Sequence, residues 1–192
     1  MTAEQLASGA DDARPRTGLR VGVVLAAVLV AALYGVVRWE SDRQYDALLS
    51  AAVDAERVVQ DSRRSLGGMV QYSSGLLART DLGPEQRAAV LDSFAVDAER
   101  FPPRMQAPRA AVADVRPLPW DGELRDARDA YLARVDAWTG FVAAALEEPE
   151  TLLLERRATR PAREQAAAAL EAASDGRGGD RLATVRDALL GR

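Results

Sequence analysis

A run of 17 residues without a charged side chain, Val21–Val37, constrains this chain more than any other feature. As an α-helix it would be about 25 Å long, and extending it to Leu19–Trp39 gives roughly 31 Å, which matches the hydrocarbon core of a bilayer. Arg20 and Arg38 flank the run, where their side chains can reach the two interfaces, and Trp39 occupies the position of an interfacial aromatic residue. We therefore expect an uncleaved transmembrane anchor over residues 19–39.

Two other interpretations of this run are weaker. A cleaved signal peptide has an apolar region of about 7–15 residues followed by a small-x-small site, whereas here the alanines lie inside the run and apolar residues continue beyond them. Buried helices of soluble proteins seldom remain uncharged over such a length. Residues 1–18, which precede the run, contain too few apolar side chains to fold alone, and we expect a disordered tail there.

Basic residues on either side of the run predict its orientation. Three arginines lie before it and two follow it closely, and basic residues favour the cytoplasmic side of a membrane. This difference predicts a single pass across the cell membrane, with the N-terminus in the cytoplasm and the C-terminal domain on the extracytoplasmic side.

Helical spacing of apolar residues continues after the anchor, over residues 40–174. Apolar side chains recur at steps of three, four or seven, and charged residues occupy most positions between them. The clearest stripes are Tyr45, Leu48, Leu49, Ala52, Val59 and Leu66, and then, on a heptad-like course, Leu124, Ala127, Tyr131, Val135, Trp138, Val142 and Leu146. Asp121 precedes the second stripe at the position of a helix cap. We predict an all-α fold in which the anchor continues into an antiparallel helical bundle of about four to five helices, with coiled-coil-like packing.

Proline and glycine predict where the helices are interrupted. Five of the nine prolines lie within residues 101–120, which predicts a stiff connection with one short helix from about Pro108 to Val115. Pro161 is expected to kink or split a later helix, and Gly67-Gly68 to weaken the first one. The sequence DGRGGD opens the segment 175–192 and predicts a flexible linker before a short C-terminal helix.

The side chains that this chain lacks limit its chemistry. It contains no Cys, His or Lys, so all 25 basic residues are arginine. Catalytic Ser-His-Asp triads, HExxH zinc sites, thiolate nucleophiles, Walker lysines and Schiff bases are thereby excluded. We expect no catalytic, cofactor-binding or metal-binding residues and no enzyme activity, and carboxylate-only catalysis is the remaining enzymatic alternative. The net charge of −4 argues against a nucleic-acid partner.

Two features are candidates for contacts with a partner. Arg156, Arg160 and Arg163 share one face of a predicted helix, where they could bind an anionic ligand, a lipid head group or an acidic protein. The alternative is a solvated face paired with glutamates. Trp120 lies in the proline-rich connection, where it either closes the end of the bundle or contacts a partner.

These observations lead to two functional hypotheses. The first is a single-pass, membrane-anchored scaffold or accessory protein in a bacterial cell-envelope complex, bound to the lipid bilayer and to an unknown protein partner or a second copy of itself. The exclusive use of arginine suggests the bacterial source, because it is typical of GC-rich coding. The second is an extracytoplasmic ligand-sensing bundle that acts through a membrane partner. A helix that runs from the membrane directly into a bundle resembles the sensory domains of bacterial chemoreceptors, which implies recognition of a small ligand.

Overall fold

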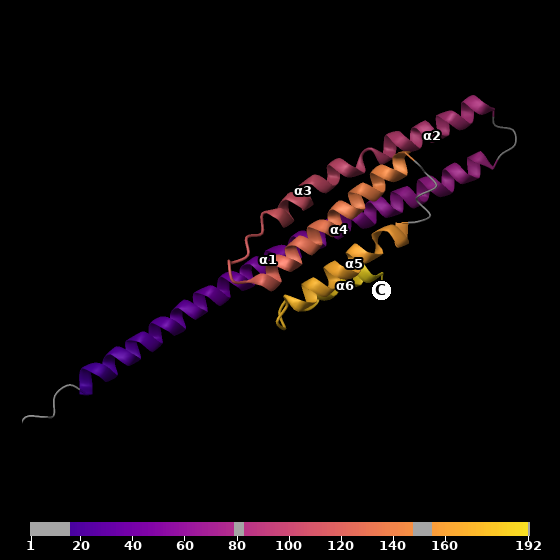
Figure 1. Ribbon diagram of the computed structural model, residues 1–192. Helices are drawn as coiled ribbons and strands as arrows, with labels where there is room; N and C mark the ends of the chain where they lie inside the picture. The colour runs from indigo at the N-terminus through magenta and orange to yellow at the C-terminus, as the bar shows by residue number, and fades with distance from the viewer. Residues whose placement is uncertain (1–15, 79–82, 148–154, 192) are drawn as a thin grey trace, which may run out of the picture. The chain divides into compact units, whose positions relative to one another are not determined.

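The computed structural model describes residues 16–78, 83–147 and 155–191, and all regular secondary structure in these ranges is α-helical (Figure 1). The all-α prediction is thus confirmed. The chain divides into two compact units, residues 1–40 and 41–192. The helices within the described ranges are α1 (Arg16–Leu77), α2 (Pro84–Ala98), α3 (Phe101–Ala113), α4 (Gly122–Glu147), α5 (Glu155–Ala172) and α6 (Gly179–Leu190).

The described part of the N-terminal unit is the first part of α1, and its apolar side chains are exposed. Large apolar residues from Val23 to Trp39 are between 58% and 67% exposed, apart from Val37, which is half-buried. The most apolar window of α1 has a mean hydropathy of 2.0, and none of it is buried. Among the described helices, α1 alone is long and apolar enough to span a bilayer, a criterion that a signal sequence near the N-terminus also meets. The predicted tail, residues 1–18, lies almost entirely outside the described residues.

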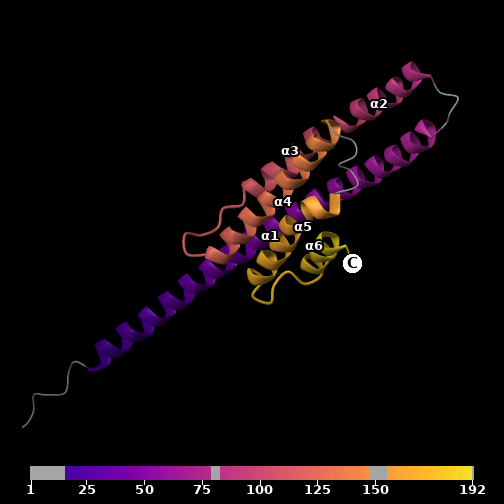
Figure 2. The ribbon, with the colours of Figure 1, turned by 45° about the vertical axis from the view of Figure 1, so that its right-hand side comes forward.

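The C-terminal unit packs its helices around one apolar core. α4 contacts both α3 and α5, and α6 packs on α5, as both ribbon views show (Figure 2). Both predicted stripes are buried, apart from Leu146, whose side chain lies outside the described residues. The most deeply buried of the large apolar side chains are Tyr45, Leu48, Leu49, Met105, Val112, Leu124, Tyr131, Trp138, Leu170 and Leu189.

The start of α4 shows how the sequence fixes a helix end. The backbone N–H of Leu124 donates to Oδ1 of Asp121 at 3.1 Å, so the predicted cap is confirmed. Such a cap satisfies one of the first N–H groups of a helix, which have no acceptor within it.

The proline-rich connection differs from its prediction. Instead of a short helix from about Pro108, α3 begins at Phe101 and continues through Pro108, so only residues after Ala113 form a loop. The reason is the position of the prolines: Pro102 and Pro103 fall in the first turn, where a helix needs no backbone donor. α5 continues through Pro161, so the helix is not split there, and α1 continues through Gly67-Gly68. An interior proline removes one backbone hydrogen bond of the helix.

The DGRGGD segment, predicted to be a flexible linker, is connected to neighbouring elements through the side chain of Arg177. Arg177 donates through Nε to the carbonyl of Ser174 and through Nη2 to the carbonyl of Ala173, both at 2.9 Å. Its Nη1 pairs with Asp42 of α1, and the guanidinium carbon lies 5.2 Å from the ring centroid of Tyr45. Arg177 therefore holds the loop between α5 and α6 against the first turns of the C-terminal unit.

The loop between α5 and α6 requires glycine at position 178. Its φ of 88° lies in the left-handed region, and an added Cβ would lie 2.8 Å from Cδ1 of Leu49 and 3.0 Å from Cε1 of Tyr45. The glycines predicted flexibility because sequence alone does not show that the backbone approaches α1 so closely.

Candidate functional site

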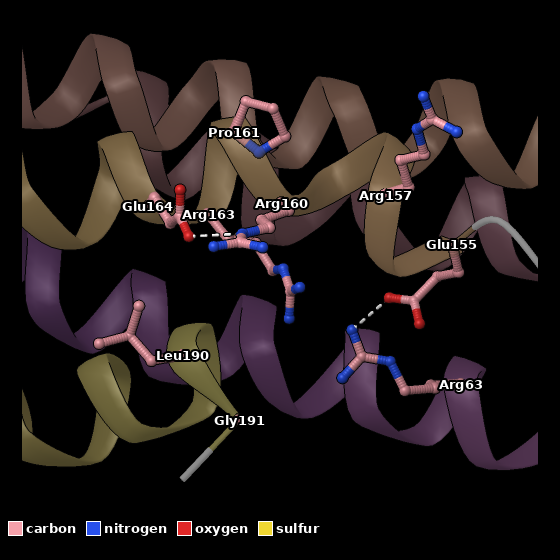
Figure 3. Close-up of a pocket in the computed structure, with 9 residues that line it drawn as sticks. All are labelled: Arg63, Glu155, Arg157, Arg160, Pro161, Arg163, Glu164, Leu190 and Gly191. Atoms are coloured by element: carbon pink, nitrogen blue, oxygen red, sulfur yellow. Dashed lines mark hydrogen bonds and ion pairs between the residues drawn. The ribbon is translucent and has the colours of Figure 1, made fainter.

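A cleft lined by arginines lies between α1, α5 and the end of α6 (Figure 3). Its volume is about 650 Å³. Four arginines and two glutamates give its lining a formal charge of +2. We call it the arginine cleft, and its lining residues are Arg63, Glu155, Arg157, Arg160, Pro161, Arg163, Glu164, Leu190 and Gly191.

Two of the four arginines in the cleft are paired with carboxylates. Arg63 of α1 contacts Glu155 at 2.5 Å, and Nε of Arg160 donates to Oε1 of Glu164 at 2.7 Å. The first pair joins two helices, and the second follows the i, i+4 spacing within α5. The glutamates therefore neutralise only part of the cleft.

Arg163 is the cationic group in the cleft with the least compensation. No hydrogen bond or ion pair joins it to another described residue, and its Nε is buried without a partner. Its pKa is lowered, first by desolvation and then by repulsion from Arg63 and Arg134, against the attraction of Glu155 and Glu56. A bound anion would raise this pKa by adding negative charge and by supplying a hydrogen-bond acceptor that Nε lacks among the described residues.

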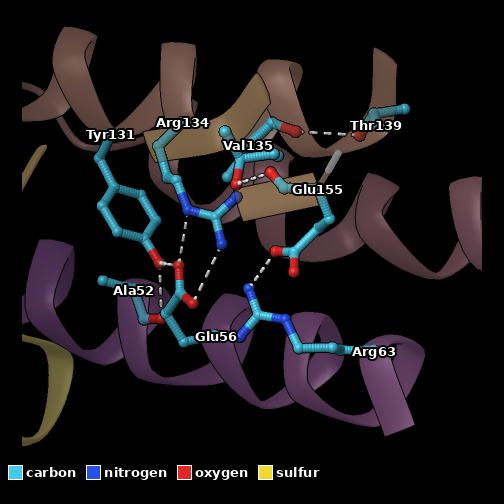
Figure 4. Close-up of polar contacts among 9 residues, drawn as sticks. Ala52, Glu56, Arg63, Tyr131, Arg134, Val135, Thr139 and Glu155 are labelled. Carbon is cyan, nitrogen blue, oxygen red and sulfur yellow. Dashed lines mark hydrogen bonds and ion pairs between the residues drawn. The ribbon is translucent and has the colours of Figure 1, made fainter. Parts of the chain in front are cut away.

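A buried polar network lies between α1 and α4 near the cleft (Figure 4). Arg134 is 1% exposed, and its Nε and Nη2 lie 3.2 and 3.3 Å from the two carboxylate oxygens of Glu56. The hydroxyl of Tyr131 lies 2.9 Å from the carbonyl oxygen of Ala52 and 3.2 Å from Oε1 of Glu56. Burial, and then the charge of Glu56, raise the pKa of Tyr131 well above its usual value. Tyr131 therefore keeps its proton and donates.

Trp138 links the arginine cleft to this network. The guanidinium carbons of Arg63 and Arg134 lie 5.5 and 5.8 Å from the centroid of its ring. Trp138 is 1% exposed, so its predicted place in the core is confirmed. Both guanidinium groups lie over the ring of Trp138, and this cation–π interaction partly compensates them for the loss of hydration. The emission of Trp138 should therefore report changes at Arg63.

The predicted contact residues do not all meet at one place. Arg160 and Arg163 line the arginine cleft, whereas the side chain of Arg156 lies outside the described residues. Trp120 lies on the loop before α4 and is 67% exposed, so it does not close the end of the bundle, and it does not line the cleft.

Sequence reasoning missed Arg63 and the buried pair, although a signal for them exists. Arg63 lies four residues after buried Val59 and three before buried Leu66, so it interrupts an apolar stripe. Glu56 and Arg134 interrupt their stripes in the same way, and charged residues at such positions are rare unless they are paired. Their partners could not be identified because α1 and α4 are far apart in the sequence.

The site offers binding groups rather than a recognisable catalytic set. Among the described residues, no group of three or more potential metal-ligating side chains occurs. Arginine and paired glutamate supply charge and hydrogen bonds, and the absence of enzyme activity stays a prediction.

No family model matches this chain, and comparisons with curated proteins and with solved structures find no match either.

Proposed function

We propose that this chain is a non-enzymatic accessory protein of a bacterial cell-envelope complex, tethered to the membrane by residues 19–39. In this proposal the C-terminal unit is an antiparallel bundle on the extracytoplasmic side, where it contacts a protein partner. The observation that carries the proposal is the exposed apolar surface of α1 between Val23 and Trp39. Apolar surface of this extent costs about 25 cal/mol per Å² in water, and a bilayer removes that cost.

Membrane extraction tests the anchor. We expect the full chain to remain with membranes after alkaline carbonate washing and to require detergent for release. The double variant Leu29→Arg/Val30→Arg should move to the soluble fraction, since each arginine at the centre of a span costs about 2.5–3.5 kcal/mol. Val96→Arg is the matched control, because Val96 is 56% exposed on α2, and it should stay with the membrane.

Two results would overturn the anchor. One is wild-type protein in the soluble fraction without detergent. The other is a mature chain that mass spectrometry shows to begin after residue 39, which would make the run a cleaved signal. If the anchor holds, crosslinking in native membranes followed by mass spectrometry identifies the partner, and a chain that crosslinks to nothing counts against the accessory role.

The arginine cleft favours a second candidate function, the sensing of an anionic ligand. The specific observation behind it is half-buried Arg163, whose Nε has no hydrogen-bond partner among the described residues. At ten times its dissociation constant, an anion stabilises the protein by about 1.4 kcal/mol, which raises Tm on the order of 3–5 °C for a unit of this size. We expect inorganic phosphate to raise Tm more than chloride at equal ionic strength.

Arg163→Gln should abolish the phosphate-specific shift. Arg109→Gln is its control, because Arg109 is an exposed arginine paired with Asp136 and does not line the cleft. Equal shifts in both variants, or no shift in the wild type, would exclude phosphate binding at this cleft and leave the accessory role as the remaining proposal.

A further inference from the structure

The loop that carries Trp120 is fastened to the beginning of the C-terminal unit. The hydroxyl of Ser41 donates to Oδ2 of Asp121 at 2.6 Å, and the backbone N–H of Arg116 donates to Oε1 of Gln44 at 3.0 Å. Both ends of the loop between α3 and α4, which we call the Trp120 loop (residues 116–121), are therefore tied to the first residues of this unit.

The loop is also fixed internally. The backbone N–H of Asp121 donates to the carbonyl of Leu118 at 2.9 Å, and Nη2 of Arg125 donates to the carbonyl of Pro119 at 2.7 Å. Asp121 uses its second carboxylate oxygen to cap α4 at Leu124. Trp120 is thus presented by a preorganised turn, which loses little conformational entropy when its side chain is covered.

The exposure of Trp120 is unusual within its unit. It is 67% exposed, whereas the other described aromatic side chains from residue 41 onward are buried: Tyr45, Phe101, Tyr131, Trp138 and Phe141. The described packing of the C-terminal unit leaves the indole exposed, so its surface is free to contact a group outside this unit.

Covalent geometry places Ser41, to which the Trp120 loop is bonded, within two residues of the end of the predicted anchor. Consecutive Cα atoms are about 3.8 Å apart, so the Cα of Ser41 lies within about 8 Å of the Cα of Trp39 whatever the orientation of the two units. The headgroup region adds roughly 5–8 Å on each side of the hydrocarbon core. If the anchor ends at Trp39, Ser41 lies in or beside this region, and so does the loop bonded to it.

We propose that Trp120 is a second membrane contact, which inserts its indole into the headgroup region of the same bilayer, on the side where the anchor ends. Tryptophan prefers this region because its ring is apolar while its N–H can still find a polar partner. Residues 116–125 contain two arginines and two acids, so the indole rather than net charge drives the contact. Zwitterionic phosphatidylcholine is therefore a sufficient partner. The proposal rests on the anchor, and its test separates the two.

The test uses the full chain in phosphatidylcholine vesicles whose acyl chains carry bromine near the head group, which quenches nearby tryptophans. We compare the wild type with Trp120→Phe and with the matched variant Trp39→Phe. Trp138 is buried and should remain unquenched. Each variant should lose roughly half of the quenched emission, because two of the three tryptophans lie at the interface in this proposal. Circular dichroism verifies that both variants remain helical.

The outcomes distinguish the inference from the anchor. Quenching that disappears in Trp39→Phe and is unchanged in Trp120→Phe overturns the second contact and leaves the anchor intact. Absence of quenching in all three proteins overturns the anchor. A Trp120 that acrylamide reaches in vesicles of the pure protein, but not in native membranes, would assign it to a protein partner, and this result also overturns the proposal.

Discussion

The first and second parts of α1 use apolar side chains in opposite ways. Between Val23 and Trp39 the large apolar side chains are exposed, apart from half-buried Val37, whereas between Tyr45 and Leu66 they form one buried stripe with charged residues between them. Both parts are α-helical, so the difference lies in the periodicity of their apolar residues. An apolar stripe on one face suits packing against other helices, whereas apolar residues on every face do not produce such a stripe. A single helix therefore carries two patterns of apolar residues, one exposed and one buried.

Among the changes in the second part of α1, removal of the charge of Glu56 should destabilise the C-terminal unit most. Glu56→Gln leaves Arg134 buried without a counter-charge, which we expect to destabilise the C-terminal unit by about 3–5 kcal/mol. Asp54→Asn is the matched control, because Asp54 forms an exposed pair with Arg57 and should change stability by less than about 1 kcal/mol. Urea unfolding in detergent measures both, and equal effects would mean that Glu56 and Arg134 are not paired in the folded protein.

A pair of leucine truncations compares the two parts directly. Leu48→Ala removes a fully buried side chain and should cost about 2–5 kcal/mol in the unfolding of the C-terminal unit. Leu29→Ala removes an exposed side chain and should leave this unfolding free energy unchanged. Chemical denaturation followed by circular dichroism compares them. Similar losses in both variants would contradict the division of α1 into an exposed part and a core-facing part.

These expectations show how far sequence reaches. Periodicity was sufficient for the helical class and for the buried stripes, because burial of one face follows from local spacing. It did not locate Arg63 against Glu155, or Arg177 against Asp42, since these pairs are 92 and 135 residues apart. The prolines of α3 were misleading because composition does not reveal their position within a helical turn.

Gly178 tests the close contact between the loop that follows α5 and the core-facing part of α1. Gly178→Ala should destabilise the C-terminal unit by about 1–3 kcal/mol, because the new Cβ requires a left-handed backbone and collides with Leu49 and Tyr45. Gly176→Ala is the control: its φ is 76°, but no atom lies within 4 Å of an added Cβ. Thermal unfolding of both isolates the cost of the collision. A smaller loss for Gly178 than for Gly176 would mean that the loop is not held against α1.

Alkaline pH should weaken the C-terminal unit by the smallest amount. Burial raises the pKa of Tyr45 to about 12 and that of Tyr131 well above 10, whereas both would ionise near pH 10 in the unfolded chain. The unfolded state then binds fewer protons than the folded state, so stability is constant below about pH 10 and falls above it. At pH 11 the contribution from Tyr45 falls by on the order of 1 kcal/mol. Unfolding free energies at pH 8 and pH 11 measure this loss, which should be smaller in Tyr45→Phe.

The bond between Arg177 and Asp42 has a consequence for the order of events during synthesis. Asp42 leaves the ribosome 135 residues before Arg177, which corresponds to roughly 7–27 s at 5–20 residues per second. During that interval the later helices, which pack against the buried stripe of α1, have not all been synthesised, whereas the apolar run Val21–Val37 is already complete. The C-terminal unit can therefore close only after Arg177 has been made, when the loop between α5 and α6 pairs with the turn of α1 that contains Asp42.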